Sequence, residues 1–121
     1  MYLHGSPEKM EPGTILRPGQ DIGKKNGGGA GERVFIVLTQ GYSLSECGDD
    51  FDVSCVFEYA VNEAAWWAGE TGYVYEVEPV GEVWADIAFD VSPACASVPQ
   101  ARIIARHDVS SGFPALYTAL R

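Results

Sequence analysis

The sequence predicts a single α+β domain that is rich in β-strands and contains one well-defined helix. The chain has 121 residues, a length typical of one domain, and 46% of them are hydrophobic, which is enough to build a core. Several short runs of β-branched and aromatic residues are separated by glycine and proline, as in strands joined by turns. Residues 54–68 repeat apolar side chains at helical spacing. We therefore expect residues 1–121 to form one strand-rich domain.

The N-terminal segment predicts a short strand followed by tight turns. Residues 2–3 are apolar, and His4 is followed at once by Gly5 and Ser6. We expect the backbone to turn after His4, which places the imidazole at a strand end where a ligand can approach closely. Residues 6–20 contain two proline-glycine pairs and leave little room for a helix.

The middle of the chain predicts a buried strand, a polar loop and a helix. Residues 34–39 form a continuous β-branched and aromatic run, which favours a strand buried on both faces. Residues 40–52 are acidic and irregular. The helix is expected over residues 54–68, with Ser54 capping its start and Gly69 ending it.

The second half of the chain predicts three strands and a short helix. Residues 73–78 alternate strictly and are typical of a half-buried strand, which the proline and glycine of residues 79–81 should end. Residues 83–89 and 101–106 are each expected to form a further strand. Residues 114–120 are expected to form a C-terminal helix with proline in its first turn.

Charge and cysteine content narrow the possible partners. The net charge of −9 disfavours nucleic-acid binding, because an acidic surface repels phosphate backbones. The chain has no apolar run of membrane-spanning length and no apparent leader at its start. The three cysteines, Cys47, Cys55 and Cys95, form no CxxC pair, and there are only two histidines. We therefore expect reduced thiols, a cytoplasmic protein and no metal site.

Four segments resemble the rifampin ADP-ribosyltransferases, in the same order along the chain. Residues 2–19, Tyr2-Leu3-His4-Gly5-Ser6 followed by two proline-glycine pairs, resemble the family's opening Tyr-His-Gly-Thr and proline-glycine pattern. Residues 62–68 resemble the helix with an Ala-x-Trp-Gly-Ala core. Residues 72–81 resemble the Tyr-x-Val-Glu-Pro-x-Gly run, and residues 101–104 resemble the closing Leu-Arg-Val-Val strand.

The resemblance implies an ADP-ribosyltransferase-like fold of two packed, mostly antiparallel β-sheets with few helices. It also implies a glycosyltransferase that uses NAD as co-substrate and passes ADP-ribose to an acceptor. That acceptor is a small molecule such as a rifamycin, which would confer antibiotic resistance, or a protein. Such enzymes use a histidine, an aromatic residue and an acid. The imidazole orients a ribose hydroxyl, the aromatic face stacks on nicotinamide, and the carboxylate stabilises the developing positive charge.

Residue by residue, the resemblance assigns His4 to the family histidine. Gly5 and Ser6 of the following turn, and Trp67 of the helix, join the cofactor-binding residues. The aromatic position falls on Phe35 if residues 34–39 are the family's strand, and on Phe57 if the alignment runs back from the helix without gaps. Phe35 is preferred because residues 54–68 fit one helix, and either choice places phenylalanine where the family usually has tyrosine.

The acid is assigned by spacing after the Glu-Pro-x-Gly run. Asp86 fits best, with Glu82 and Asp90 as alternatives. The family's stretch of two adjacent acids and its later Ser-Tyr-Arg segment have no counterpart in the matching segments of this chain. These departures keep two other functions open: a non-catalytic NAD-binding module on the same fold, and an NAD glycohydrolase in which water is the acceptor.

The polar loop over residues 41–53 is a candidate for acceptor contact. Its charged residues are all acidic. We therefore expect it to repel anionic acceptors and to tolerate neutral or cationic ones.

Overall fold

The strands form one antiparallel sheet. The computed structural model describes residues 1–18, 34–39, 56–85 and 95–121. Its seven-stranded sheet has the order β2-β7-β4-β1-β3-β6-β5, and every described pairing is antiparallel. The strands are β1 (Tyr2–Ser6), β2 (Ile15–Leu16), β3 (Val34–Leu38), β4 (Tyr73–Val80), β5 (Trp84–Ala85), β6 (Cys95–Val98) and β7 (Gln100–Asp108). The helices are α3 (Val56–Ala68), the short 3₁₀ helix η2 (Val109–Ser111) and α4 (Phe113–Leu120). The predicted α+β class is confirmed.

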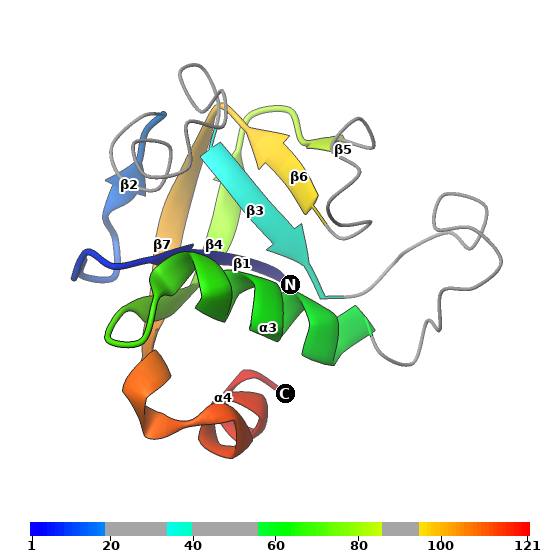
Figure 1. The fold of residues 1–121 in the computed structure, drawn as a ribbon. Coiled ribbons are helices and arrows are strands. Elements are labelled where there is room, and N and C mark those ends of the chain that lie inside the picture. The colour runs from blue at the N-terminus through cyan, green and yellow to red at the C-terminus, as the bar shows by residue number, and fades with distance from the viewer. Residues whose placement is uncertain (19–33, 40–55, 86–94) are drawn as a thin grey trace, which may run out of the picture.

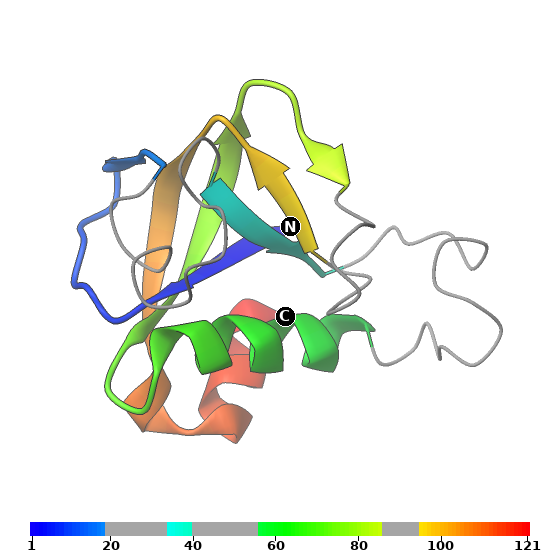
Figure 2. The same cartoon turned by 45° about the horizontal axis from the view of Figure 1, so that its top comes forward.

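The sheet parts beside β1, which joins its two halves. Strand β1 pairs with β4 along all of residues 2–6, but with β3 only at Tyr2 and Leu3. Beyond Leu3 the two neighbours of β1 diverge, and β3 and β6 run at a steep angle to β4 and β7 (Figures 1 and 2). The expected two sheets are thus the halves of one sheet whose hydrogen bonding is continuous through β1. We call the place where β1 and β3 separate the β1–β3 fork.

One hydrophobic cluster holds the two halves of the sheet together. It contains buried residues from strands on both sides of β1: Leu16, Val34, Ile36, Tyr75, Val77, Ala96, Val98, Ala101 and Ile103. Because these residues are distant in the strand order yet pack together, the sheet must curl so that its halves face each other.

A second cluster lies between the sheet and the helices. It comprises Leu3, Val37, Ala60, Val61, Ala64, Ala65, Val74, Leu116 and Leu120. The alanines of α3 present little bulk, so the helix approaches β1 closely. A Cβ built on Gly5 would lie 1.7 Å from the carbonyl oxygen of Ala64. Glycine is therefore required at this position by the helix packed above it.

The predicted turn after His4 is wrong. His4, Gly5 and Ser6 are all strand residues, and they pair with Tyr75, Val74 and Tyr73 of β4. Gly5, which suggested a turn, is instead needed because α3 packs closely against it. His4 consequently stands in the interior of a strand.

The strongest sequence patterns gave the expected elements. The strand over residues 34–39 and the helix ending before Gly69 are confirmed, and Gly69 has a φ of +79°. The C-terminal helix is confirmed with proline in its first turn. Of the predicted strand over residues 83–89, the structure describes Trp84–Ala85. Ser54 lies outside the described residues.

Strand β4 differs from the expected half-buried strand in two ways. It continues through Pro79 to Val80, because that end pairs with β7. Both of its faces are covered: Val74 packs in the cluster beneath the helices, and Tyr75 and Val77 pack in the cluster between the halves of the sheet. The late strand predicted over residues 101–106 is confirmed and extends over Gln100–Asp108.

None of the helices described is long and apolar enough to cross a membrane.

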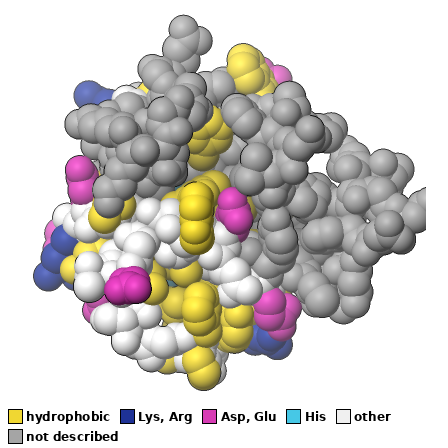
Figure 3. All heavy atoms as spheres, in the orientation of Figure 1, with side chains coloured by type: hydrophobic (Ala, Val, Ile, Leu, Met, Phe, Trp, Pro, Cys, Tyr) yellow, Lys and Arg dark blue, Asp and Glu magenta, His cyan; other side chains and the backbone are white. Residues whose placement is uncertain are grey.

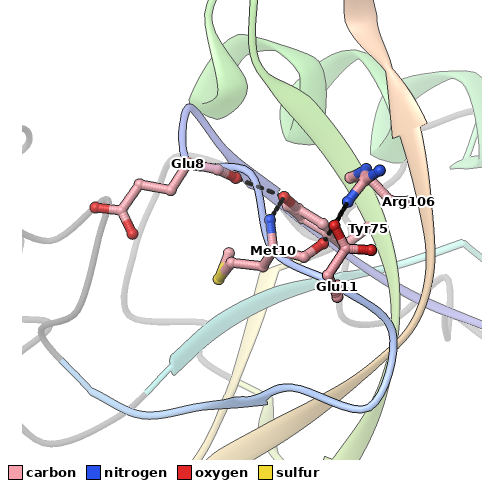
Figure 4. A network of polar contacts seen from close by, with 5 residues as sticks. All are labelled: Glu8, Met10, Glu11, Tyr75 and Arg106. Atoms are coloured by element: carbon pink, nitrogen blue, oxygen red, sulfur yellow. Dashed lines mark hydrogen bonds and ion pairs between the residues drawn. The ribbon is translucent and has the colours of Figure 1, made fainter.

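A buried tyrosine fixes the segment that follows β1 (Figure 4). The Tyr75 hydroxyl donates to the carbonyl of Glu8 at 2.5 Å and accepts from the backbone N–H of Met10 at 2.8 Å. Arg106 of β7 donates to the Met10 carbonyl at 3.0 Å and to the Glu11 carboxylate at 2.9 Å. Arg106 also lowers the pKa of the Glu11 carboxyl, through their hydrogen bond first and their opposite charges second.

We expect Tyr75→Phe to lower the free energy of unfolding by about 2–3 kcal/mol, because it leaves two backbone groups without their shared partner. Chemical denaturation measures this difference. Tyr73→Phe removes the same hydroxyl from a half-buried neighbour and is the matched control. Equal losses in both variants would contradict the role assigned to the Tyr75 hydroxyl.

Candidate functional site

His4 stands at the β1–β3 fork with its imidazole buried. The residue is 2% exposed, and its Nδ1 lies 2.7 Å from the carbonyl oxygen of Phe35 on β3. A carbonyl can only accept, so Nδ1 carries the proton and donates it. In the neutral ring the basic nitrogen is then Nε2. A side-chain bond thus joins β1 to β3 at the point where their backbone pairing has ended.

Trp67 approaches His4 from the last turn of α3. The two ring centroids are 6.4 Å apart and the ring planes are inclined by 58°. The two rings are tilted toward each other, a geometry close to the edge-to-face packing that aromatic pairs prefer. The adjacent Trp66, by contrast, is 72% exposed. Hydrophobic side chains lie among polar ones on the face of the molecule that carries the helices (Figure 3).

Phe35 lies in a row of paired residues that crosses three strands. It pairs with Ser97 of β6, and Ser97 pairs with Trp84 of β5. Directly paired residues share a face of the sheet, so the side chains of Phe35, Ser97 and Trp84 point to the same side. Ser97 is buried and Trp84 is exposed. Sequence patterns did not predict this row, because β6 was not among the expected strands.

Phe57, the alternative aromatic residue, lies elsewhere. Its ring is 6.1 Å from that of Tyr117 on α4, and the guanidinium of Arg121 lies 4.8 Å from its centroid. It therefore belongs to the flank of α3 that faces α4. Phe35, in contrast, contacts His4, and it does so through its backbone carbonyl.

Gly5 and Ser6 contact the protein itself. The Ser6 hydroxyl is fully buried and accepts a hydrogen bond from the Glu8 backbone N–H at 3.1 Å. Gly5 lies against Ala64. Both residues therefore shape the strand and the bend after it, rather than forming an exposed turn beside His4.

The structure describes one of the three predicted acids. Glu82 is described; it is exposed and precedes β5 by two residues. Asp86, which follows Ala85 directly, and Asp90 lie outside the described residues, as does the candidate acceptor loop over residues 41–53.

The structure adds one acid that sequence reasoning missed. Glu63 is half-buried on α3, one turn before Trp67. Burial raises the pKa of the Glu63 carboxyl, and the neighbouring Trp67 side chain partly opposes the rise. The spacing of four residues on a helix was a usable signal, because it places the two side chains on the same flank.

The second histidine lies in a different part of the sheet, where it contacts a carboxylate. His107 Nε2 lies 2.8 Å from the Glu76 carboxylate, between neighbouring strands β7 and β4. Within the described ranges, no three side chains of histidine, cysteine, aspartate or glutamate gather as metal ligands would.

No family model matches the chain, and a search of curated proteins finds no match. The site is therefore interpreted from its own geometry and from the resemblance in sequence.

Proposed function

We propose that this protein is an NAD-dependent mono-ADP-ribosyltransferase that transfers ADP-ribose to a small rifamycin-like molecule or to a protein. The resemblance in sequence supports the reaction. One structural observation supports the site: the His4 imidazole lies at the fork in the sheet, its Nδ1 is held by Phe35, and Trp67 packs beside it. These three residues are distant in sequence, and each belongs to the set that the resemblance names.

In this reaction the bond between nicotinamide nitrogen and ribose breaks, and its electron pair goes to the nicotinamide ring. The acceptor's nucleophilic atom then bonds to the ribose carbon and releases its proton to water. His4 would orient a ribose hydroxyl through its imidazole ring. Trp67 and Phe35 would offer aromatic faces to nicotinamide. The Asp86 carboxylate would stabilise the positive charge that develops on the ribose.

The second candidate is a non-catalytic NAD-binding module. Two observations favour it: β3 carries phenylalanine where the family usually has tyrosine, and His4 is 2% exposed. An NAD glycohydrolase, with water as the acceptor, would use the same residues as the transferase.

One assay separates the three functions. The protein is incubated with NAD, with and without a rifamycin, and nicotinamide release and ADP-ribosylated products are measured by mass spectrometry. Transfer predicts a labelled acceptor, and glycohydrolysis predicts nicotinamide and free ADP-ribose without any acceptor. NAD binding without nicotinamide release supports the non-catalytic module.

Replacing His4 with asparagine tests the site directly. The asparagine amide can still donate to the Phe35 carbonyl, but it has no counterpart of Nε2. We expect NAD affinity to fall at least about tenfold, because a hydrogen bond that orients the ribose is lost. Calorimetry measures the affinity, and a thermal melt shows whether the protein stays folded.

His107→Asn is the matched control, because it removes the other imidazole from its place beside Glu76. It should leave NAD affinity within about twofold of the parent, as expected for a residue away from the bound ligand. Unchanged NAD affinity in a folded His4→Asn protein would overturn the assignment of His4.

A further inference from the structure

We propose that Trp84 is the residue against which the acceptor stacks, and that this acceptor is a small molecule with a planar aromatic group and no phosphate. The inference rests on the function proposed above and adds the binding residue and the chemistry of its second substrate. Neither the sequence patterns nor the resemblance assigned a role to Trp84.

Trp84 offers a large apolar surface at the edge of the sheet. It lies on the two-residue strand β5, the last strand in the order of the sheet, and it is 52% exposed (Figure 1). Tryptophan side chains are on average well buried, because covering a large aromatic ring is strongly favourable. A flat ligand that covers the exposed part of the Trp84 indole would gain that energy.

The row of paired residues fixes the side to which Trp84 points. Trp84 pairs with Ser97 of β6, and Ser97 pairs with Phe35 of β3. Their neighbours along β3 and β6 pack in the cluster between the halves of the sheet: Val34, Ile36, Ala96 and Val98. Since successive side chains alternate, the row faces away from that cluster. On β3 this is the side on which Val37 packs with α3, so Trp84 and Phe35 point to the side that carries α3.

The spacing within the row leaves room for two bound molecules. Neighbouring strands are about 4.8 Å apart, so the backbones at Phe35 and Trp84 are about 10 Å apart. Ser97 between them is small and buried, and it raises no bulky side chain between the two rings. Nicotinamide on Phe35 and an acceptor on Trp84 would therefore bring their reacting atoms together between the rings, where proximity speeds bond formation.

The row is also joined to the imidazole of the proposed site. His4 donates to the backbone carbonyl of Phe35 at 2.7 Å, and Trp67 packs beside His4. The acceptor residue and the NAD-binding residues thus meet at one strand, β3. An acceptor on Trp84 would lie next to the bond that breaks.

Charge on this half of the sheet selects against an anionic ligand. The sequence has no lysine or arginine between Arg33 and Arg102, a stretch that contains β3, β5 and β6 as well as α3. Glu82, two residues before Trp84, is exposed. A phosphate bound at Trp84 would receive no basic side chain from these elements and would meet the negative field of the chain.

Adenine of NAD is the other planar group that an indole could hold. Adenine is tied to the pyrophosphate, which carries negative charge, so its binding place should lie near basic side chains. Within the described residues, the arginines that stand in strands are Arg102 and Arg106, both on β7 in the opposite half of the sheet. We therefore assign Trp84 to the acceptor and not to adenine.

Steady-state kinetics with NAD and rifampin tests this assignment. We expect Trp84→Ala to raise the KM for rifampin about tenfold, because an aromatic stacking surface is lost. The kcat and the affinity for NAD should stay within about twofold of the parent, as for a residue that only binds the second substrate. Trp84→Phe should recover most of the loss, because a phenyl ring still offers a flat face. An unchanged KM for rifampin in Trp84→Ala overturns the proposal.

Trp66→Ala is the matched control. Trp66 is the more exposed of the two tryptophans, and it stands on α3 instead of the row. Its loss should leave the KM for rifampin within about twofold of the parent, because it lies outside the proposed contact. Thermal melts show that each variant stays folded. Equal effects at Trp66 and Trp84 would indicate a general contribution of exposed rings and contradict the site.

Direct binding keeps this inference distinguishable from the proposed function. Calorimetry measures rifampin affinity with and without nicotinamide, so that no transfer takes place. If the parent binds rifampin but transfers no ADP-ribose, the proposed function fails, and the affinity of Trp84→Ala still decides the role of Trp84. A parent that binds no rifampin overturns the acceptor site.

Two further results would also overturn it. Weaker binding of NAD instead of rifampin in Trp84→Ala would assign Trp84 to adenine. AMP is planar and aromatic but carries a phosphate, and we expect it not to displace rifampin. Displacement by AMP that is lost in Trp84→Ala would contradict the argument from charge.

Discussion

Gly5→Ala is expected to destabilise the protein by about 3 kcal/mol or more, because it places a methyl group inside the backbone of α3. The added Cβ would lie 1.7 Å from the Ala64 carbonyl oxygen and 2.7 Å from its carbon. These are backbone atoms that cannot rotate away, so helix and strand must separate. Leu3 and Ala64 pack in the same buried cluster, which the separation would open to water. A lowered melting temperature with partial loss of the native spectrum is the expected result.

Gly13→Ala is the control for this change. Nothing lies within 4 Å of a Cβ built on Gly13, and only its φ of +93° opposes a side chain. Its cost should therefore be about 1 kcal/mol, the usual penalty for a left-handed conformation. If Gly5→Ala costs no more than Gly13→Ala, then α3 does not pack on β1 as closely as the structure has it.

Asp86→Asn is expected to slow NAD cleavage by about 10²–10³-fold while changing NAD affinity little, if the proposed function is correct. A carboxylate that faces the ribose stabilises positive charge that exists only as the nicotinamide leaves, and losing one such preorganised contact commonly has this effect. Single-turnover release of nicotinamide measures the rate, and calorimetry measures the affinity. The substitution preserves the size of the side chain, so a change in packing should be small.

Glu82→Gln and Asp90→Asn are the comparisons for Asp86. Both remove one negative charge from the same stretch of the acidic chain. A loss of rate in Glu82→Gln with Asp86→Asn unaffected would move the acid to Glu82. Equal modest losses in all three variants would indicate a general effect of charge and contradict a single catalytic carboxylate.

Local pattern was sufficient for the elements whose residues form a continuous apolar run or carry a clear period. The continuous run at β3, the helical spacing of α3 and the apolar strand at β7 predicted their types correctly, because the pattern of apolar side chains directly reflects which faces are covered. Strands β2 and β6 were missed. They span two and four residues, too few to show a period, and they form because longer strands offer them partners.

The candidate site, like the fold, was predicted only in part. The sequence suggested His4, Phe35 and Trp67 by resemblance, but the turn that it predicted around His4 is a strand in the structure. Local reasoning explains glycine by the freedom of its own backbone. At Gly5 the decisive neighbour is Ala64, a residue 59 positions away along the chain by their numbers.

By itself, the sequence determined the α+β class, the main helix, the longer strands and the acidic character of the chain, since each depends on composition or on nearest neighbours along the chain. Only the tertiary structure decided that β1 pairs fully with β4 and briefly with β3, so that the sheet forks beside His4. It also decided that Trp67 meets His4. These contacts join residues from separate elements, and their geometry follows from how α3 packs against the sheet.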